Sequence, residues 1–232
     1  MKKILKKLIN LFGYEINKSR GQRINMRQSL LHLKENGYKP KLIVDVGVAD
    51  GTPEIYEIFP ESKFLLVEPL DYFQKSINKI IKTYDATHIK VAAGSSSGIK
   101  KFMISENKHS NSSFYSGKLD RKEVSVRVDT LDNIVDGFSI DDLSILKIDV
   151  EGAELDVLKG GNESIKRFDF IILELTFTGF LNNASKPAEI INHMSKNNFE
   201  MIDIFNLRNN HKNDLSQGDF LFKNCHDNAT TN

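Results

Sequence analysis

Short apolar runs alternate with amphipathic segments along most of the chain. Four of these runs are rich in Val, Ile, Leu and Phe and have the length of strands buried on both faces of a sheet: 42–46, 64–67, 143–148 and 168–175. A weaker run at 88–92 predicts a further strand. Between the runs, apolar residues recur at helical spacing, most clearly in the segment 71–84. Strands that alternate with helices predict an α/β fold with a mostly parallel sheet.

The alternation of strands and helices is interrupted at two places in the chain. Two strands expected within 95–128 have no helix between them, which predicts a β-insertion that reaches toward the substrate. The polar composition of 95–128 fits an ordinary surface loop equally well. Near the C-terminus, the strands expected at 200–205 and 219–222 also follow one another without a helix, which indicates an antiparallel finish to the sheet.

The chain divides into a short cap, one domain and a tail. Residues 1–40 are predicted to form an N-terminal helical cap, because 26–33 has apolar residues on one helical face and Asn36-Gly37 is typical of a helix C-terminus. The α/β domain is expected to span 41–223, a suitable length for one domain in a chain of 232 residues. The polar residues 224–232 predict a flexible tail.

A strand, a glycine turn and a helix start follow one another at 42–54. Gly47 and Gly51 come directly after the strand, and Thr52-Pro53 is typical of the first residues of a helix. Such an element binds nucleotide-like ligands at the carboxyl edge of an α/β sheet. Ala49 stands where a dinucleotide fingerprint requires its middle glycine, so a pyrophosphate ligand is disfavoured.

Four of the predicted strands carry an acid at or near the carboxyl end: Asp45, Glu68, Asp149 and Glu174. Charged residues are rarely buried without a partner, and this edge is where α/β folds bind ligands. Glu68 stands where an acid accepts hydrogen bonds from ribose hydroxyls. Together the acids favour a nucleoside-bearing cofactor such as S-adenosylmethionine, whose positive charges suit an acidic rim. Helix capping or salt bridging by the same acids is the alternative.

Composition and charge narrow the possible partners. A net charge of +1 gives no basic field to recruit nucleic acid. The single Cys225 excludes an internal disulfide framework and is compatible with a reducing compartment such as the cytoplasm. No apolar run reaches the length of about 18 residues that a membrane-spanning helix requires. Residues 1–12 predict a basic amphipathic helix, which either lies peripherally on an anionic membrane or packs on its own domain or on the second subunit of a homodimer.

The run Leu-Lys-Ile-Asp-Val-Glu-Gly-Ala-Glu at 146–154, with Val-Leu-Lys-Gly at 157–160, resembles the signature of the FkbM family of S-adenosylmethionine-dependent methyltransferases. Further matching segments are 45–47, 67–69, 92–93, 111–114, 128–132 and 219–222. The resemblance covers about residues 41–223. It implies a class I methyltransferase fold, which is a Rossmann-like three-layer α/β sandwich with a mostly parallel seven-stranded sheet and an antiparallel last strand. It also implies O-methylation of a hydroxyl, commonly on a sugar, a glycan or a secondary metabolite.

The resemblance implies roles for the matching residues in cofactor binding. Asp45, Gly47 and Gly51 would hold the methionine end of S-adenosylmethionine. Glu68 would take the ribose hydroxyls, and Ala92 would lie near the adenine.

Three acids are candidates for the chemistry at the acceptor. An alcohol is a poor nucleophile, so a base within hydrogen-bond reach should assist it. Asp149 is the first candidate, because it ends the central strand where donor and acceptor should meet, and it also counts as a cofactor-binding candidate. Glu151 and Glu174 are the next candidates. A divalent metal held by Asp149 and Glu174 is a possible but disfavoured alternative, since the sequence offers no evident third ligand.

Two functions from other classes stay open. An NAD-dependent oxidoreductase uses a similar first turn and acid, but Ala49 and the antiparallel finish disfavour it. A non-catalytic, membrane-associated protein that binds the cofactor is the other alternative, with 1–12 as its membrane contact. The sequence does not identify the small-molecule or glycan acceptor, whose specificity we expect in the loops at 95–128, 176–186 and 206–218.

Overall fold

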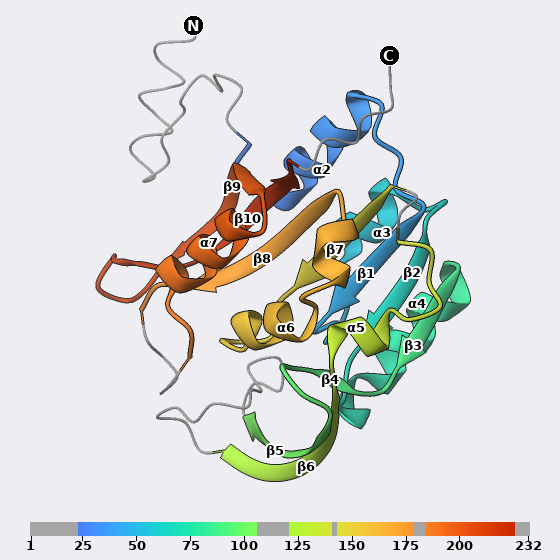
Figure 1. The fold of residues 1–232 in the computed structure, drawn as a ribbon, viewed down its shortest axis with the longest axis vertical. Helices are drawn as coiled ribbons and strands as arrows, with labels where there is room; N and C mark the ends of the chain where they lie inside the picture. The colour runs from blue at the N-terminus through green and yellow to red at the C-terminus, as the bar shows by residue number, and fades with distance from the viewer. Residues whose placement is uncertain (1–22, 106–120, 141–142, 179–183, 226–232) are drawn as a thin grey trace, which may run out of the picture.

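A seven-stranded sheet organises the protein in the computed structural model, which describes residues 23–105, 121–140, 143–178 and 184–225 (Figure 1). Its strands are β1 (Leu42–Val46), β2 (Lys63–Val67), β3 (Ala86–Ile89), β7 (Ser144–Ile148), β8 (Phe170–Thr176), β9 (Phe199–Asn209) and β10 (Leu215–Asn224). They are ordered β3-β2-β1-β7-β8-β10-β9. The pairs from β3 through β8 are parallel, whereas β10 is antiparallel to both β8 and β9. The mostly parallel sheet with an antiparallel last strand is therefore confirmed.

Helices cover both faces of this sheet and complete a three-layer sandwich (Figure 1). The helices are α2 (Met26–Glu35), α3 (Pro53–Ile58), α4 (Gln74–Thr83), α5 (Leu131–Ile134), α6 (Glu154–Gly160) and α7 (Pro187–Lys196), with short 3-10 turns at Asp71–Phe73 and Ser164–Arg167. Val44 of β1 belongs to a buried cluster that includes residues of α5, α6 and α7. Its neighbour Ile43 points the other way, into a cluster that includes residues of α2, α3 and α4. The strands are buried on both faces, as their continuous apolar runs predict.

A second, smaller sheet confirms the β-insertion. It contains β4 (Ala92–Ala93), β5 (Gly98–Ser105) and β6 (Arg121–Asp129), in the order β4-β6-β5, with β5 and β6 antiparallel. Phe102 and Val126 of this sheet are buried in the same cluster as Ile43, so the described part of the insertion is not an ordinary surface loop. Ala92 was expected in the third strand of the main sheet, but that strand ends at Ile89 and Ala92 pairs with Val128 instead. Residues 106–120 lie outside the described residues.

The N-terminal helix ends where the sequence predicts, whereas the C-terminal strand is longer than predicted. α2 ends as predicted, with Asn36 as its C-cap and Gly37 in the left-handed region at φ +87°. The tail begins later than expected, because Asn224 is still in β10 and its side chain donates to the carbonyls of Lys166 and Phe168. The predicted helix at 1–12 lies outside the described residues. Among the helices that the structure describes, none is long and apolar enough to cross a membrane.

Candidate active site

The turn after β1 brings two strand ends unusually close together. Gly47 adopts φ +80°, and its N–H donates to the carbonyl of Val67 at the end of β2 over 2.9 Å. A Cβ at this position would lie 1.8 Å from the carbonyl oxygen of Asp149, which follows β7. Only glycine combines this backbone conformation with such a close approach. The first turn therefore fixes the ends of β1, β2 and β7 against one another.

A cleft opens beside this turn, at the carboxyl edge of the sheet. It encloses about 500 Å³ of empty space, part of it open to solvent. The predicted site residues that line it are Gly47, Glu68, Ala92, Asp149 and Glu151. Leu70, Phe73 and Phe102 add an apolar wall, so the β-insertion contributes to the cleft through β5.

Glu68 is held rigidly at the edge of this cleft. Its carboxylate accepts the N–H of Ala49 over 3.1 Å through one oxygen and the N–H of Leu70 over 3.0 Å through the other. The residue is 5% exposed. Burial raises the pKa of Glu68 to about 7, although the two backbone N–H groups lower it in part. The two N–H bonds leave each oxygen a further lone pair for a ligand.

Asp45 does not lie where the sequence analysis expected it. Its side chain is fully buried, and its carboxylate accepts hydrogen bonds from the hydroxyls of Thr52 over 3.0 Å and Tyr56 over 2.6 Å. The Lys147 ammonium lies 3.3 Å from the same carboxylate. Thr52 consequently makes no side-chain cap to α3, although it is the N-cap residue. Asp45 lies inside the protein and is not part of the cleft lining, so its expected contact with the cofactor stays a prediction.

Gly51 also has a different role from the expected one. Its φ of +102° is in the left-handed region, and a Cβ there would lie 2.9 Å from Cδ1 of Ile80 on α4. Gly51 is not part of the cleft lining. It allows α4 to pack closely against the turn, and the expected contact with the methionine end of the cofactor is not supported by its position.

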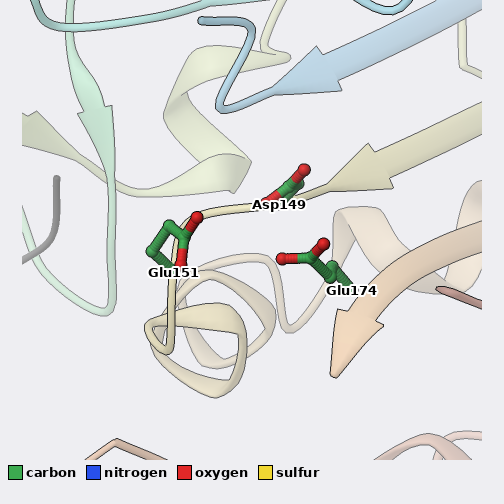
Figure 2. A group of neighbouring side chains, drawn as sticks. All are labelled: Asp149, Glu151 and Glu174. Carbon is green, nitrogen blue, oxygen red and sulfur yellow. The ribbon is translucent and has the colours of Figure 1, made fainter. Parts of the chain in front are cut away.

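Three acids gather at the ends of β7 and β8 (Figure 2). Carboxylate oxygens of Asp149, Glu151 and Glu174 all lie within 4.8 Å of one another. Asp149 and Glu151 line the cleft, whereas Glu174 is 7% exposed and is not part of the lining. Glu174 accepts a hydrogen bond from Nε2 of Gln217 over 3.2 Å. The structure therefore brings together all three predicted catalytic candidates, but only two of them face the cleft.

Further charged groups surround Glu174. Arg208 on β9 places a guanidinium nitrogen 3.6 Å from its carboxylate. Asp219 on β10 is the direct register partner of Glu174 and is itself buried. Burial raises the pKa of Glu174 well above its ordinary value, and the negative charges of Asp149, Glu151 and Asp219 raise it further. Glu174 is consequently protonated more readily than an ordinary glutamate.

Two buried charged residues of this region were missed by the sequence analysis. Asp219 lies in the apolar run that ends the domain; burial raises its pKa to about 6, while a hydrogen bond from Asn206 over 2.6 Å lowers it in part. Lys147 lies inside β7 and has a side chain that is 7% exposed. A charged residue within a run of buried strand residues is the signal that could have identified both, since such a residue requires a partner.

The acids also allow a test of the metal alternative. Glu151 supplies the third carboxylate that the sequence did not reveal. However, Glu174 already accepts from Gln217 and lies beside Arg208, and acidic side chains also gather where a site receives a positively charged ligand. The geometry by itself defines no metal site, and we assign no step to a metal.

The strand order, the reversed β10 and the acid-lined cleft at the carboxyl edge together define the class I methyltransferase architecture. A sequence model of the methyltransferase FkbM domain matches residues 43–201, and the chain belongs to this family. The protein is therefore an S-adenosylmethionine-dependent methyltransferase.

Comparison with other proteins finds distant similarities. A search of curated proteins gives no match. The solved structure of the ribosomal protein L11 methylase from Lactobacillus delbrueckii subsp. bulgaricus is similar over 86% of this chain and 78% of its own, with 13% identity and a TM-score of 0.48. Fibrillarin from Aeropyrum pernix, in complex with natively bound S-adenosyl-L-methionine, is similar over 80% of this chain and 67% of its own, with 10% identity and a TM-score of 0.46.

Proposed function

We propose that this methyltransferase binds S-adenosylmethionine in the cleft beside Gly47 and methylates a hydroxyl oxygen of a sugar, a glycan or a secondary metabolite. The observation that carries the proposal is that Glu68 and Asp149, from two different strand ends, line the same cleft. Acids at opposite ends of the sheet would have been incompatible with a shared ligand.

The chemistry of the lining fits the cofactor. Glu68 presents a fixed carboxylate with free lone pairs, which suits a pair of ribose hydroxyls. Ala92 and Phe102 provide an apolar wall for a flat base. Gly47 lets a ligand approach the backbone, and Asp149 supplies negative charge near a positively charged sulfur. When bound, S-adenosylmethionine supplies a methyl group on that sulfur.

Asp149 is the best-placed base for the acceptor. Its side chain is 34% exposed and reaches the cleft from the end of the central strand. A carboxylate there accepts the hydroxyl proton while the oxygen forms its new bond to carbon and the carbon–sulfur bond breaks. Alignment of the acceptor in line with that bond contributes up to about 7–11 kcal/mol, and the base contributes about 10²–10⁴-fold in rate. Glu151, which also lines the cleft, adds negative charge beside this group.

A turnover assay tests the proposal. Purified protein is incubated with S-adenosylmethionine and a panel of nucleotide sugars and glycans, and release of S-adenosylhomocysteine is measured together with product masses. We expect an acceptor that gains the mass of one methylene group. Binding of NADH with no binding of S-adenosylmethionine would instead favour the oxidoreductase alternative.

We also propose that the acceptor is not nucleic acid, which the net charge of +1 supports. We propose a cytoplasmic location as well, with which the single Cys225 is compatible. Contact of residues 1–12 with an anionic membrane stays a prediction, and flotation with anionic liposomes of the full chain and of a chain that lacks these residues tests it. A homodimer likewise stays a prediction, which sedimentation of the full chain tests.

A further inference from the structure

Lys147 is a buried cation between two carboxylates. It lies in β7 directly opposite Asp45 of β1 in the register of the two parallel strands. Its ammonium lies 3.3 Å from the carboxylate of Asp45 and 3.6 Å from that of Asp149. Asp149 follows two residues later, directly after the end of β7, and its side chain turns toward the ammonium of Lys147.

The two carboxylates depend on Lys147 to different degrees. Asp45 is fully buried and already accepts hydrogen bonds from two hydroxyls, those of Thr52 and Tyr56. Asp149 is partly exposed, and the ion pair with Lys147 ties its side chain to the protein interior. Removal of the ammonium would leave Asp45 anchored, whereas Asp149 would lose this tie.

The charged groups around Lys147 also indicate that Asp149 depends on its ammonium. The acids that face Lys147 are Asp45 on β1, Glu68 after β2, Asp149 after β7 and Asp219 on β10. Arg208 on β9 is 61% exposed, and its guanidinium lies 3.6 Å from the carboxylate of Glu174. Without a buried ammonium, Asp149 would experience mainly repulsion from its neighbours and would turn toward solvent.

We propose that Lys147 is a positioning residue, which holds the carboxylate of Asp149 in place at the cleft so that it can meet the acceptor hydroxyl. This inference rests on the proposed function, because the consequence of the position lies in methyl transfer. Lys147 does not line the cleft and acts through Asp149 alone.

A pair of variants separates positioning from folding. Lys147→Met alone leaves a buried carboxylate without its cation, and such variants often unfold. Combining it with Asp45→Asn replaces both partners of the buried pair with neutral side chains of similar shape, which should preserve the fold. Asp45→Asn alone is the matched control, because it keeps the ammonium beside Asp149.

The first readout is structural and needs no acceptor. In a crystal structure of the ligand-free Lys147→Met/Asp45→Asn variant, we expect the Asp149 carboxylate to have left its position, whereas it stays in place in Asp45→Asn. An Asp149 side chain that keeps its position in the double variant overturns the proposal.

The second readout is kinetic, with S-adenosylmethionine and the acceptor identified in the turnover assay. We expect kcat of the double variant to fall by about 100-fold, as for a misplaced reacting group, while the dissociation constant for S-adenosylmethionine changes little. Adding Asp149→Asn should lower kcat little further, because both changes act through one group. Fully additive losses overturn the proposal. A wild-type chain that methylates no acceptor overturns the proposed function, and the crystal structures then still decide the positioning role.

Discussion

The backbone N–H of Ala49 donates a hydrogen bond to Oε2 of Glu68 over 3.1 Å, which links the turn after β1 to the acid after β2. Ala49 can point its N–H this way because it adopts φ +45°, a conformation that costs an L-residue roughly 1–2 kcal/mol. The turn thus fixes the carboxylate, and the carboxylate stabilises the turn. This side of the cleft is therefore held in place by the chain itself.

Adding a Cβ at position 47 should destabilise the fold and distort the cleft. Gly47→Ala would place its methyl group 1.8 Å from the carbonyl of Asp149, whereas the control Gly137→Ala, at φ +81°, meets nothing within 4 Å. We expect the control to lower the free energy of unfolding by about 1–2 kcal/mol, the cost of the backbone conformation. Gly47→Ala should cost at least about 2 kcal/mol more, because the chain must move. Equal losses in urea unfolding would show that the close approach is unimportant.

Asp45 should matter for stability and not for cofactor contact. Tyr56→Phe removes the 2.6 Å hydrogen bond to this buried carboxylate, and we expect a loss of about 1–3 kcal/mol in the free energy of unfolding. Tyr72→Phe, at a residue that is 63% exposed, is the control and should change little. The affinity of folded Tyr56→Phe for S-adenosylmethionine, measured by calorimetry, should stay near that of the wild type. A large loss of affinity with unchanged stability would instead indicate that Asp45 contributes to cofactor binding.

Glu154 should make stability depend on pH. Burial raises its pKa from 4.5 to about 7, with the N–H groups of Gly152 and Val150 opposing the shift. The folded protein therefore binds this proton more tightly than the unfolded chain, and the associated stability is present below pH 4.5 and is lost as pH rises through about 7. Glu154→Gln removes the titration, so the fall in the free energy of unfolding across this range should become smaller by up to about 3 kcal/mol.

Urea unfolding at several pH values measures this difference. Glu163→Gln, at a side chain that is 76% exposed, should keep the wild-type pH dependence. A Glu154→Gln profile parallel to the wild-type profile would mean that folding does not raise the pKa of Glu154.

Asp149→Asn should separate catalysis from binding. We expect kcat to fall by about 10²–10⁴-fold, because the amide no longer accepts the hydroxyl proton. The dissociation constant for S-adenosylmethionine should change far less. Asp136→Asn, at an exposed residue after α5, is the control and should retain turnover. If Asp149→Asn turns over at the wild-type rate, Asp149 has a structural role and Glu151 becomes the leading candidate.

Much of the fold follows from sequence periodicity. The strand at Leu42–Val46 was predicted with the bounds that the structure shows, because a buried parallel strand is a continuous apolar run between turn residues. The end of β10 was harder to predict. Asn224 is polar, but it is retained in the strand by hydrogen bonds to the carbonyls of Lys166 and Phe168, which are distant in sequence.

The sequence predicted only part of the candidate site, because contacts between distant segments decide the rest. Chain order alone places acids at strand ends, and it correctly placed Glu68 and Asp149 at one cleft. It does not reveal whether a given acid faces a ligand or the protein. Asp45 faces inward because Tyr56, Thr52 and Lys147 converge on it from other elements, and only the fold brings them there.

Calorimetric titration of S-adenosylmethionine into the wild type, Glu68→Ala and the control Glu163→Ala tests the central claim most directly. We predict micromolar-range or tighter binding to the wild type and the control, and a strong loss of affinity in a Glu68→Ala variant that remains folded by circular dichroism. Equal affinity of all three proteins would contradict the assignment of the cleft beside Gly47 as the cofactor site.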